Sequence, residues 1–145
     1  MAFLVWEPAF SVGVWEIDRQ HRSLIGLINQ LHEAQAGDGP QQKLQAVFAA
    51  TVDYVRNHFV FEESYLERLG YEDLERHKER HQELLSQLGH MRRLFDAGPL
   101  TVSPELVRFL KEWVTSHILQ CDRGYASLAA QKNQRLMMTV SVDEM

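Results

Sequence analysis

The sequence predicts an all-α domain, an up-down-up-down antiparallel four-helix bundle with an irregular N-terminal arm. Three observations support this fold class: four long segments carry apolar residues at helical spacing, turn residues separate them, and strand-like alternation is absent. The 145 residues are the size of one domain, and a hydrophobic fraction of 45% is ordinary for a globular protein. We expect one domain over 1–145, with the arm at 1–17, the bundle at about 18–130 and a C-terminal tail at about 131–145.

The first two helices are expected near 18–36 and 41–69. The segment 37–40 between them, Gly-Asp-Gly-Pro, has the composition of a loop, and Pro40 suits the first turn of the helix that follows. Gly70 is a stop signal for the second helix.

The other two helices are expected near 72–97 and 104–130. The third ends at the Gly-Pro pair 98–99. Ser103, directly before Pro104, is the expected N-cap of the fourth.

Within these segments, apolar residues alternate at spacings of three and four, which places them on one face of each helix, as in a bundle core. Six polar side chains occupy positions in this pattern where a core leucine is expected. They are His21, His58, Glu62, His77, His81 and His117. Burying each without a partner would cost on the order of 1–3 kcal/mol, and the sum would rival the whole stability of a small domain. A metal that takes up their lone pairs removes this cost.

The expected topology brings these six residues to one end of the bundle. Short connections make neighbouring helices antiparallel, so the start of the first and third helices lies beside the end of the second and fourth. His58 and Glu62 are four residues apart, as are His77 and His81, which places each pair on one helix face. We therefore predict that the six residues converge on one metal site.

The number and type of these ligands favour two ions of iron or manganese. Five imidazoles and one or two carboxylates are too many for a single ion that keeps an open position, and structural zinc sites take four ligands, often cysteines. The chain has one cysteine, Cys121, so neither an internal disulfide nor a thiolate cluster can form. Calcium and magnesium prefer oxygen ligands, whereas mixed nitrogen and oxygen ligands suit iron or manganese. The paired Glu-x-x-His motifs of ferritin-like di-iron proteins do not occur in the sequence.

Asp122 follows His117 by five residues, a spacing that does not fit one face of an ideal helix. From spacing alone we expect Asp122 to be a solvated residue. A π-bulge, or a carboxylate that reaches sideways, would instead bring it to the metals.

Longer motifs resemble the hemerythrin family, and in particular its single-domain bacterial members, the bacteriohemerythrins. The matching pieces are Trp6 with Ser11-Val12-Gly13-Val14, Ile17-Asp18-Arg19-Gln20-His21, His58-Phe59-Val60-Phe61-Glu62-Glu63, Gly70-Tyr71, His77-Lys78-Glu79-Arg80-His81, and Trp113-x-x-x-His117-Ile118-x-x-x-Asp122-x-x-Tyr125. Their order and spacing agree with the family over nearly the full domain.

The resemblance implies a centre of two non-haem iron ions joined by an oxo or hydroxo bridge. One iron would be held by three imidazoles, those of His77, His81 and His117. The other would be held by His21 and His58 and would keep an open coordination position. Glu62 and Asp122 would bridge the two irons, so the resemblance replaces the expectation that spacing gives for Asp122. An apolar oxygen pocket would be lined by Leu24, Trp113 and Ile118, although plain core packing explains each of these three equally well.

The function implied by the resemblance is reversible dioxygen binding, by an oxygen carrier, store or delivery protein rather than an enzyme. One alternative is an oxygen or redox sensor that acts on a separate partner. Another is a di-iron enzyme: an oxidase, a peroxidase, or a protein that handles nitric oxide or iron. The expected partners are dioxygen and, for delivery, an oxygen-consuming enzyme.

Five residues beside this pattern have simpler interpretations. His32 and His90 fall off the apolar faces and are expected to be solvated, and Cys121 is expected to be a small buried hydrophobe. Glu63 faces away from Glu62, at the surface or behind a ligand. Tyr125 is either a core tyrosine or a hydrogen-bond donor next to the metals.

The net charge of −5 is spread over interspersed acids and bases, which argues against a nucleic-acid or anionic-membrane partner. No stretch approaches the length of a membrane span. Residues 1–10 lack a basic segment and are interrupted by Glu7 and Pro8, unlike a signal peptide. A cytoplasmic monomer is the default expectation.

Overall fold

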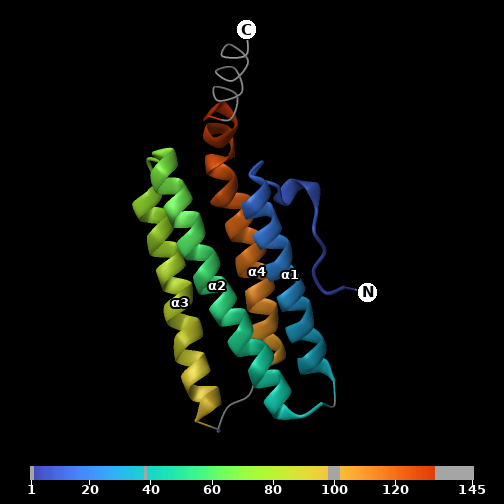
Figure 1. Ribbon diagram of the computed structural model, residues 1–145. Helices are drawn as coiled ribbons and strands as arrows, with labels where there is room; N and C mark the ends of the chain where they lie inside the picture. Colours follow the sequence, from blue (N-terminus) through green and yellow to red (C-terminus); the bar gives the residue numbers. More distant parts are fainter. Residues whose placement is uncertain (1, 38, 98–101, 133–145) are drawn as a thin grey trace.

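The computed structural model describes residues 2–37, 39–97 and 102–132, and the regular elements in these ranges are all helical. Four long helices form a bundle: α1 (Trp15–Ala36), α2 (Gln41–Leu69), α3 (Leu74–Asp96) and α4 (Pro104–Gln120). Successive helices run in opposite directions, and α1 and α4 lie side by side (Figure 1). The predicted up-down-up-down bundle is confirmed.

Local sequence signals fix two of the helix ends. Gly70 has a φ of 76°, a left-handed conformation that glycine adopts without a steric penalty. It ends α2 with its N–H bonded to the Glu67 carbonyl, while the next N–H bonds to the Leu66 carbonyl, each at 3.1 Å. At the start of α4, the Ser103 hydroxyl accepts the N–H of Leu106 at 3.1 Å, as predicted for an N-cap.

The N-terminal arm contains a short 3-10 helix, η1 (Pro8–Phe10), and α1 begins at Trp15, three residues earlier than predicted. The Asp18 carboxylate joins the arm to the start of this helix. It accepts the Ser11 hydroxyl at 2.6 Å and the Val12 N–H at 2.9 Å, which ties the end of the arm to the first turn of α1.

Farther back, the arm packs along α1. The side chain of Asn29 pairs with both the N–H and the carbonyl of Leu4, each at 2.8 Å. The ring of Phe3 stacks on His32 with 4.1 Å between ring centroids. His32 is therefore half-buried rather than solvated as predicted, because the arm covers it, whereas His90 is exposed.

The fourth helix is interrupted where the sequence predicts a continuous helix over 104–130. It ends at Gln120, and a 3-10 turn, η2 (Asp122–Tyr125), separates it from the helical residues 126–132. Gly124 lets this turn pack closely, because a Cβ at that position would lie 2.8 Å from the Tyr71 hydroxyl oxygen. Residues 131–132 of the predicted tail are helical; the rest of the tail and the stop at 98–99 fall outside the described residues.

Two apolar clusters lie in the interior. The larger fills most of the bundle and includes residues from all four helices, among them Ile28, Phe48, Leu88 and Leu110. The smaller lies at the end where η2 packs, and is formed by Val12, Ile17, Leu66, Leu69, Tyr125 and Ala129. Between the two clusters lies the buried polar cluster described below.

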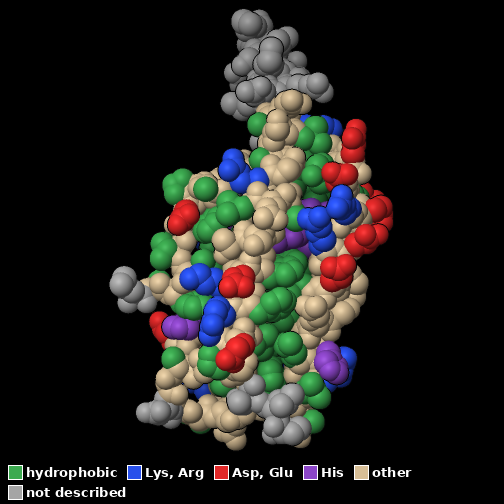
Figure 2. Space-filling view, turned by 180° about the vertical axis from the view of Figure 1, so that it is seen from behind, with side chains coloured by type: hydrophobic (Ala, Val, Ile, Leu, Met, Phe, Trp, Pro, Cys, Tyr) green, Lys and Arg blue, Asp and Glu red, His purple; other side chains and the backbone are tan. Residues whose placement is uncertain are grey.

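The surface carries both signs of charge. Seen from behind, the bundle shows acidic and basic side chains interspersed, with hydrophobic side chains gathered down the middle of this face (Figure 2). None of the described helices combines the length and the apolar character that a membrane crossing requires.

Candidate metal centre

Seven polar side chains meet in the interior near one end of the bundle, each at most 6% exposed. They are His21, His58, Glu62, His77, His81, His117 and Asp122. The structure thus brings together all seven residues singled out in the sequence. Their ligand atoms form two overlapping groups, one of Glu62, His77, His81, His117 and Asp122, the other of His21, His58 and Glu62.

The Glu62 carboxylate faces both groups. Its Oε1 lies 2.7 Å from Nε2 of His77 and 3.1 Å from Nε2 of His81. Its Oε2 faces the other way, 3.6 Å from Nε2 of His21 and 3.5 Å from Nε2 of His58. Each oxygen of one carboxylate therefore serves a different group, which is the arrangement a bridging ligand needs.

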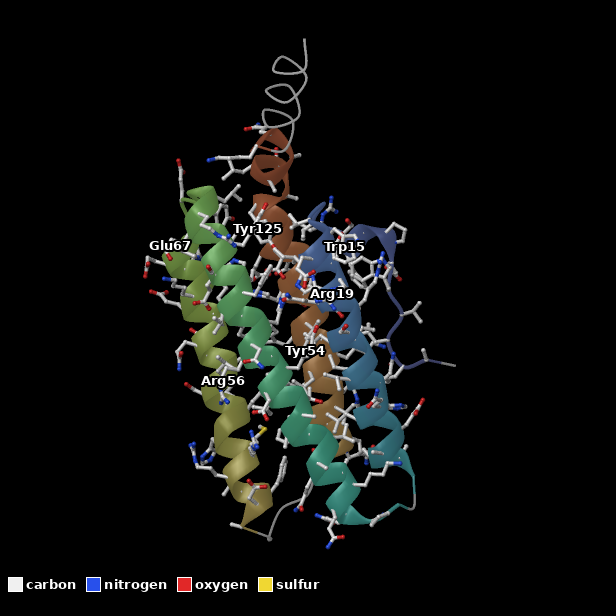
Figure 3. The ribbon with its side chains drawn as sticks, in the orientation of Figure 1. Trp15, Arg19, Tyr54, Arg56, Glu67 and Tyr125 are labelled. Carbon is white, nitrogen blue, oxygen red and sulfur yellow. The ribbon has the colours of Figure 1, made fainter. Side chains whose placement is uncertain are left out.

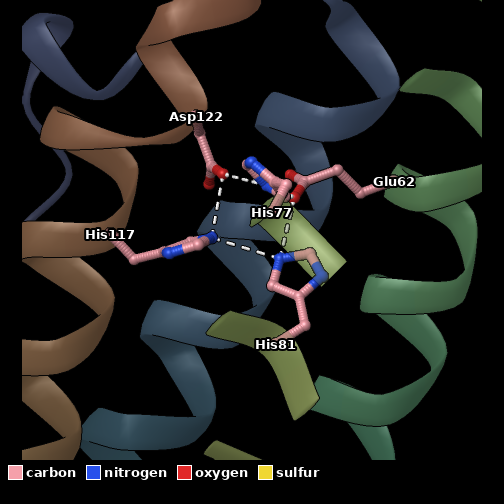
Figure 4. Close-up of side chains that lie close together, drawn as sticks. All are labelled: Glu62, His77, His81, His117 and Asp122. Atoms are coloured by element: carbon pink, nitrogen blue, oxygen red, sulfur yellow. Dashed lines mark hydrogen bonds and ion pairs between the residues drawn. The ribbon is translucent and has the colours of Figure 1, made fainter. Parts of the chain in front are cut away.

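Asp122 repeats this arrangement from the opposite side (Figure 4). Its Oδ1 lies 3.0 Å from Nε2 of His77 and 3.1 Å from Nε2 of His117, while Oδ2 lies 3.3 Å from Nε2 of His21. The end of α4 explains how a residue five positions after His117 reaches the interior. The chain leaves the α-helix at Gln120, so Asp122 stands on the η2 turn rather than on the outer face of a continued helix. The solvated position expected from spacing alone is wrong, and neither a π-bulge nor a continuous helix is needed.

Charges of both signs are stabilised within the cluster. Burial alone would raise the pKa of the Glu62 carboxyl, but the four imidazoles that surround it, those of His21, His58, His77 and His81, hold it well below its usual range. Burial, with the nearby Glu62 charge, would also raise the pKa of Asp122, yet contacts with His117 and His21 lower it. Conversely, burial disfavours the imidazolium forms, but the two carboxylates raise the pKa of His21 to about 9 and of His77 to about 10.

The donor atoms fit a bound cation better than they fit one another. His81 and His117 point their Nε2 atoms at each other across 3.1 Å, so a proton or a cation must separate the two lone pairs. Both oxygens of Asp122 are buried without a hydrogen bond of acceptable geometry among the described residues, although imidazole nitrogens lie within 3.3 Å. Buried carboxylate oxygens seldom lack a partner. Nitrogen and oxygen lone pairs aimed at shared points suit iron or manganese ions.

Aromatic rings stack on one face of two imidazoles. Phe59 stacks on His81 with 3.6 Å between centroids, and Trp113 stacks on His117 at 4.4 Å. Of the other predicted pocket residues, Leu24 and Ile118 are buried in the larger apolar cluster. Trp113 itself is half-buried and lines a surface cavity of about 410 Å³ between α3 and α4.

Two neighbours, Tyr125 and Cys121, add detail that the sequence left open or missed. Tyr125, which points into the bundle in Figure 3, is fully buried and donates its hydroxyl proton to Oε2 of Glu62 at 3.1 Å. Burial and the Glu62 and Asp122 charges raise the pKa of Tyr125 well above 10, so it stays a donor. Cys121 is half-buried rather than buried, and its thiol contacts the Arg80 guanidinium.

Two side chains form hydrogen bonds to imidazoles from behind the cluster, and the sequence had indicated a role for only one of them, Glu63. Nδ1 of His58 lies 2.6 Å from Oε1 of Gln20, and Nδ1 of His81 lies 2.8 Å from Oε2 of Glu63. Glu63 thus lies behind His81, one of the two positions expected for it. The only available signal for Gln20 was its place directly before His21.

Comparisons with known proteins agree with this geometry. Residues 12–129 match the family model described as the hemerythrin HHE cation binding domain. A bacteriohemerythrin of Pseudomonas aeruginosa is 34% identical over 137 residues, covering 94% of this chain and 88% of that protein. A bacteriohemerythrin of Stenotrophomonas maltophilia is 36% identical over 135 residues, covering 92% of this chain and 87% of that protein.

A solved structure is also similar. The crystal structure of wild-type hemerythrin has a TM-score of 0.84 and 30% sequence identity, covering 88% of this chain and 98% of that one. The family match runs from the N-terminal arm to the helical residues after η2 and includes all seven residues of the buried cluster. The predicted resemblance is confirmed, and the chain belongs to the hemerythrin family.

Proposed function

We propose that this protein binds dioxygen reversibly at a di-iron centre formed by the seven clustered residues. His77, His81 and His117 would hold one iron and His21 and His58 the other, with Glu62 and Asp122 shared between them. The single observation that carries the proposal is the placement of the Glu62 and Asp122 carboxylates. In each of them, one oxygen faces the imidazoles of one group and the second oxygen faces those of the other group. A pair of iron ions supplies the two electrons that dioxygen takes up when it is bound reversibly.

The count of ligands supports binding over turnover. Five imidazoles and two shared carboxylates occupy most coordination positions of two ions, which leaves little room for a co-substrate beside dioxygen. No described side chain in the cluster needs to act as a nucleophile or to transfer a group. The relatives that share the bundle are named bacteriohemerythrins.

The protein's own part is to hold the ligands and to exclude water. The seven side chains are at most 6% exposed, and the smaller apolar cluster closes the end of the bundle above them. Phe59, which is 3% exposed, stacks on His81 and keeps water from that face of the imidazole. A dry site slows proton delivery and the loss of a reduced oxygen species, and so protects reversibility.

Gas cycling of the iron-loaded protein tests the proposal. The protein is reduced anaerobically, exposed to dioxygen, and returned to anaerobic conditions several times while its visible spectrum is recorded. Repeated appearance and loss of the same spectrum is the expected result, with two irons per chain by metal analysis.

Two outcomes would contradict the proposal. Irreversible oxidation within the first cycle would rule out a carrier and leave a sensor or a redox role. Steady consumption of dioxygen with a reductant, peroxide or nitric oxide would instead indicate an enzyme.

A further inference from the structure

Two of the five clustered imidazoles are held from behind by side chains outside the cluster. Within the described residues, Nδ1 of His58 meets the Gln20 side-chain amide at 2.6 Å, and Nδ1 of His81 meets the Glu63 carboxylate at 2.8 Å. His58 and His81 belong to different groups of ligand atoms. One such contact therefore stands behind each of the two metal positions.

Both contacts impose the same tautomer on the ring. An ionised carboxylate can only accept, so the His81 ring donates its Nδ1 proton to Glu63. At the other contact, the Gln20 amide nitrogen donates to Glu16 at 3.2 Å, which turns the amide oxygen toward His58. The His58 ring therefore also donates from Nδ1. In both rings the lone pair of Nε2 then points into the cluster.

The two acceptors differ in charge. Glu63 presents an anionic carboxylate whose side chain is 25% exposed, whereas Gln20 presents a neutral amide. On the α1 side, the nearest negative charge is that of Glu16, which accepts a hydrogen bond from the Gln20 amide rather than from the imidazole. Glu16 in turn forms an ion pair with Arg19. A carboxylate that accepts the Nδ1 proton raises the electron density at Nε2 more than an amide does.

We propose that Gln20 and Glu63 are positioning residues that make the two metal positions electronically unequal. Glu63 would make His81 the stronger electron donor and favour the higher charge state of an ion bound there. Gln20 would orient His58 in the same tautomer with a weaker donor strength. This inference rests on the proposed di-iron centre and deepens it, because it assigns which position is easier to oxidise.

Substitutions at Glu63 separate orientation from charge. Glu63→Gln keeps an acceptor for Nδ1 but removes the negative charge, so the anaerobic protein should keep two irons while its reduction potential rises. A tenfold change in the oxidation equilibrium corresponds to about 59 mV for one electron. Glu63→Ala removes the acceptor as well and should release iron(II) to a chelator on the order of 10–100 times faster.

The control for charge is Glu67→Gln, on an exposed side chain one turn farther along α2 that points away from the bundle (Figure 3). It should leave both the potential and the iron-release rate unchanged. Thermal unfolding of each chelator-treated variant separates loss of ligand positioning from loss of fold.

Exchanging the charges on α1 tests the Gln20 contact. The double variant Glu16→Gln/Gln20→Glu moves the carboxylate from position 16 to position 20, where it contacts His58, at constant net charge. It should lower the reduction potential. Glu16→Gln alone keeps the neutral amide at His58 and should not.

The outcomes distinguish a failure of the roles proposed for Gln20 and Glu63 from a failure of the proposed di-iron centre. If the wild-type, Glu63→Gln and Glu67→Gln proteins each bind two irons and all three have the same reduction potential, this inference is overturned and the proposed function stands. Failure of the wild-type protein to retain iron would overturn both.

Discussion

Replacing Tyr125 by phenylalanine removes one hydroxyl and tests how the buried charge of Glu62 is balanced. The hydroxyl donates to Oε2 of Glu62 at 3.1 Å, and the tyrosine is fully buried, so water cannot take its place. A hydrogen bond to a charged group contributes about 1.5–3 kcal/mol, compared with about 0.5–1.5 kcal/mol for a neutral pair. We expect Tyr125→Phe to lower the free energy of unfolding by about 1.5–3 kcal/mol.

Tyr54→Phe is the matched control. Its hydroxyl donates at 3.2 Å to a neutral acceptor, the backbone carbonyl of Gln20, and the side chain is only half-buried (Figure 3). We expect a loss in the lower range, because water can replace the missing partner there. Urea denaturation of both chelator-treated variants at pH 7 measures the difference, with an unchanged m-value showing that the unfolding transition is comparable.

The comparison has a clear negative outcome. Equal losses in the two variants would show that the Tyr125 hydroxyl does not interact with an ionised carboxylate. A double-mutant cycle with Glu62→Gln sharpens the result. Tyr125→Phe should cost less stability in the Glu62→Gln background than in the wild-type protein, because the acceptor is then neutral.

Three further predictions follow from single features. His77→Ala should lose iron, because His77 contacts both shared carboxylates, whereas His32→Ala should keep two irons per chain by metal analysis; equal retention would contradict the site. In chelator-treated protein, the raised pKa values of His21 and His77 add stability that is complete below about pH 6.5 and is lost as the pH rises through about 9 to 10; urea titrations that stay flat from pH 6 to 10 would refute this. Ser103→Ala should cost about 1 kcal/mol in urea denaturation through the lost cap on the Leu106 N–H, with the iron content unchanged.

Much of the fold could be predicted because helical periodicity and turn residues are local properties. The apolar faces of the helices, the end of α2 at Gly70 and the N-cap at Ser103 follow from residues within a few positions of each other. The burial of the six polar residues at core positions was also predictable, because their spacing places them on the apolar faces of the helices.

The remaining features depend on contacts between distant segments. Spacing arguments for Asp122 assume a continuous helix, and the turn that breaks it packs against Tyr71, more than fifty residues earlier in the chain. The half-buried state of His32 depends on Phe3 in the arm. The partners of Gln20 and Glu63 lie 38 and 18 residues away, so no local pattern indicates them.

The order of the cluster residues along the chain has a consequence for how the protein is made. His21 lies in the second turn of α1, whereas Asp122 follows α4, roughly 100 residues later. An ion bound by both would restrict the unfolded chain as a covalent cross-link does, and the entropy relation for a closed loop of that length gives about 4–5 kcal/mol. Such a cross-link cannot form on the ribosome until nearly the whole bundle has been synthesised. Iron would thus be captured by a finished bundle, and its loss would loosen the first and last helices together.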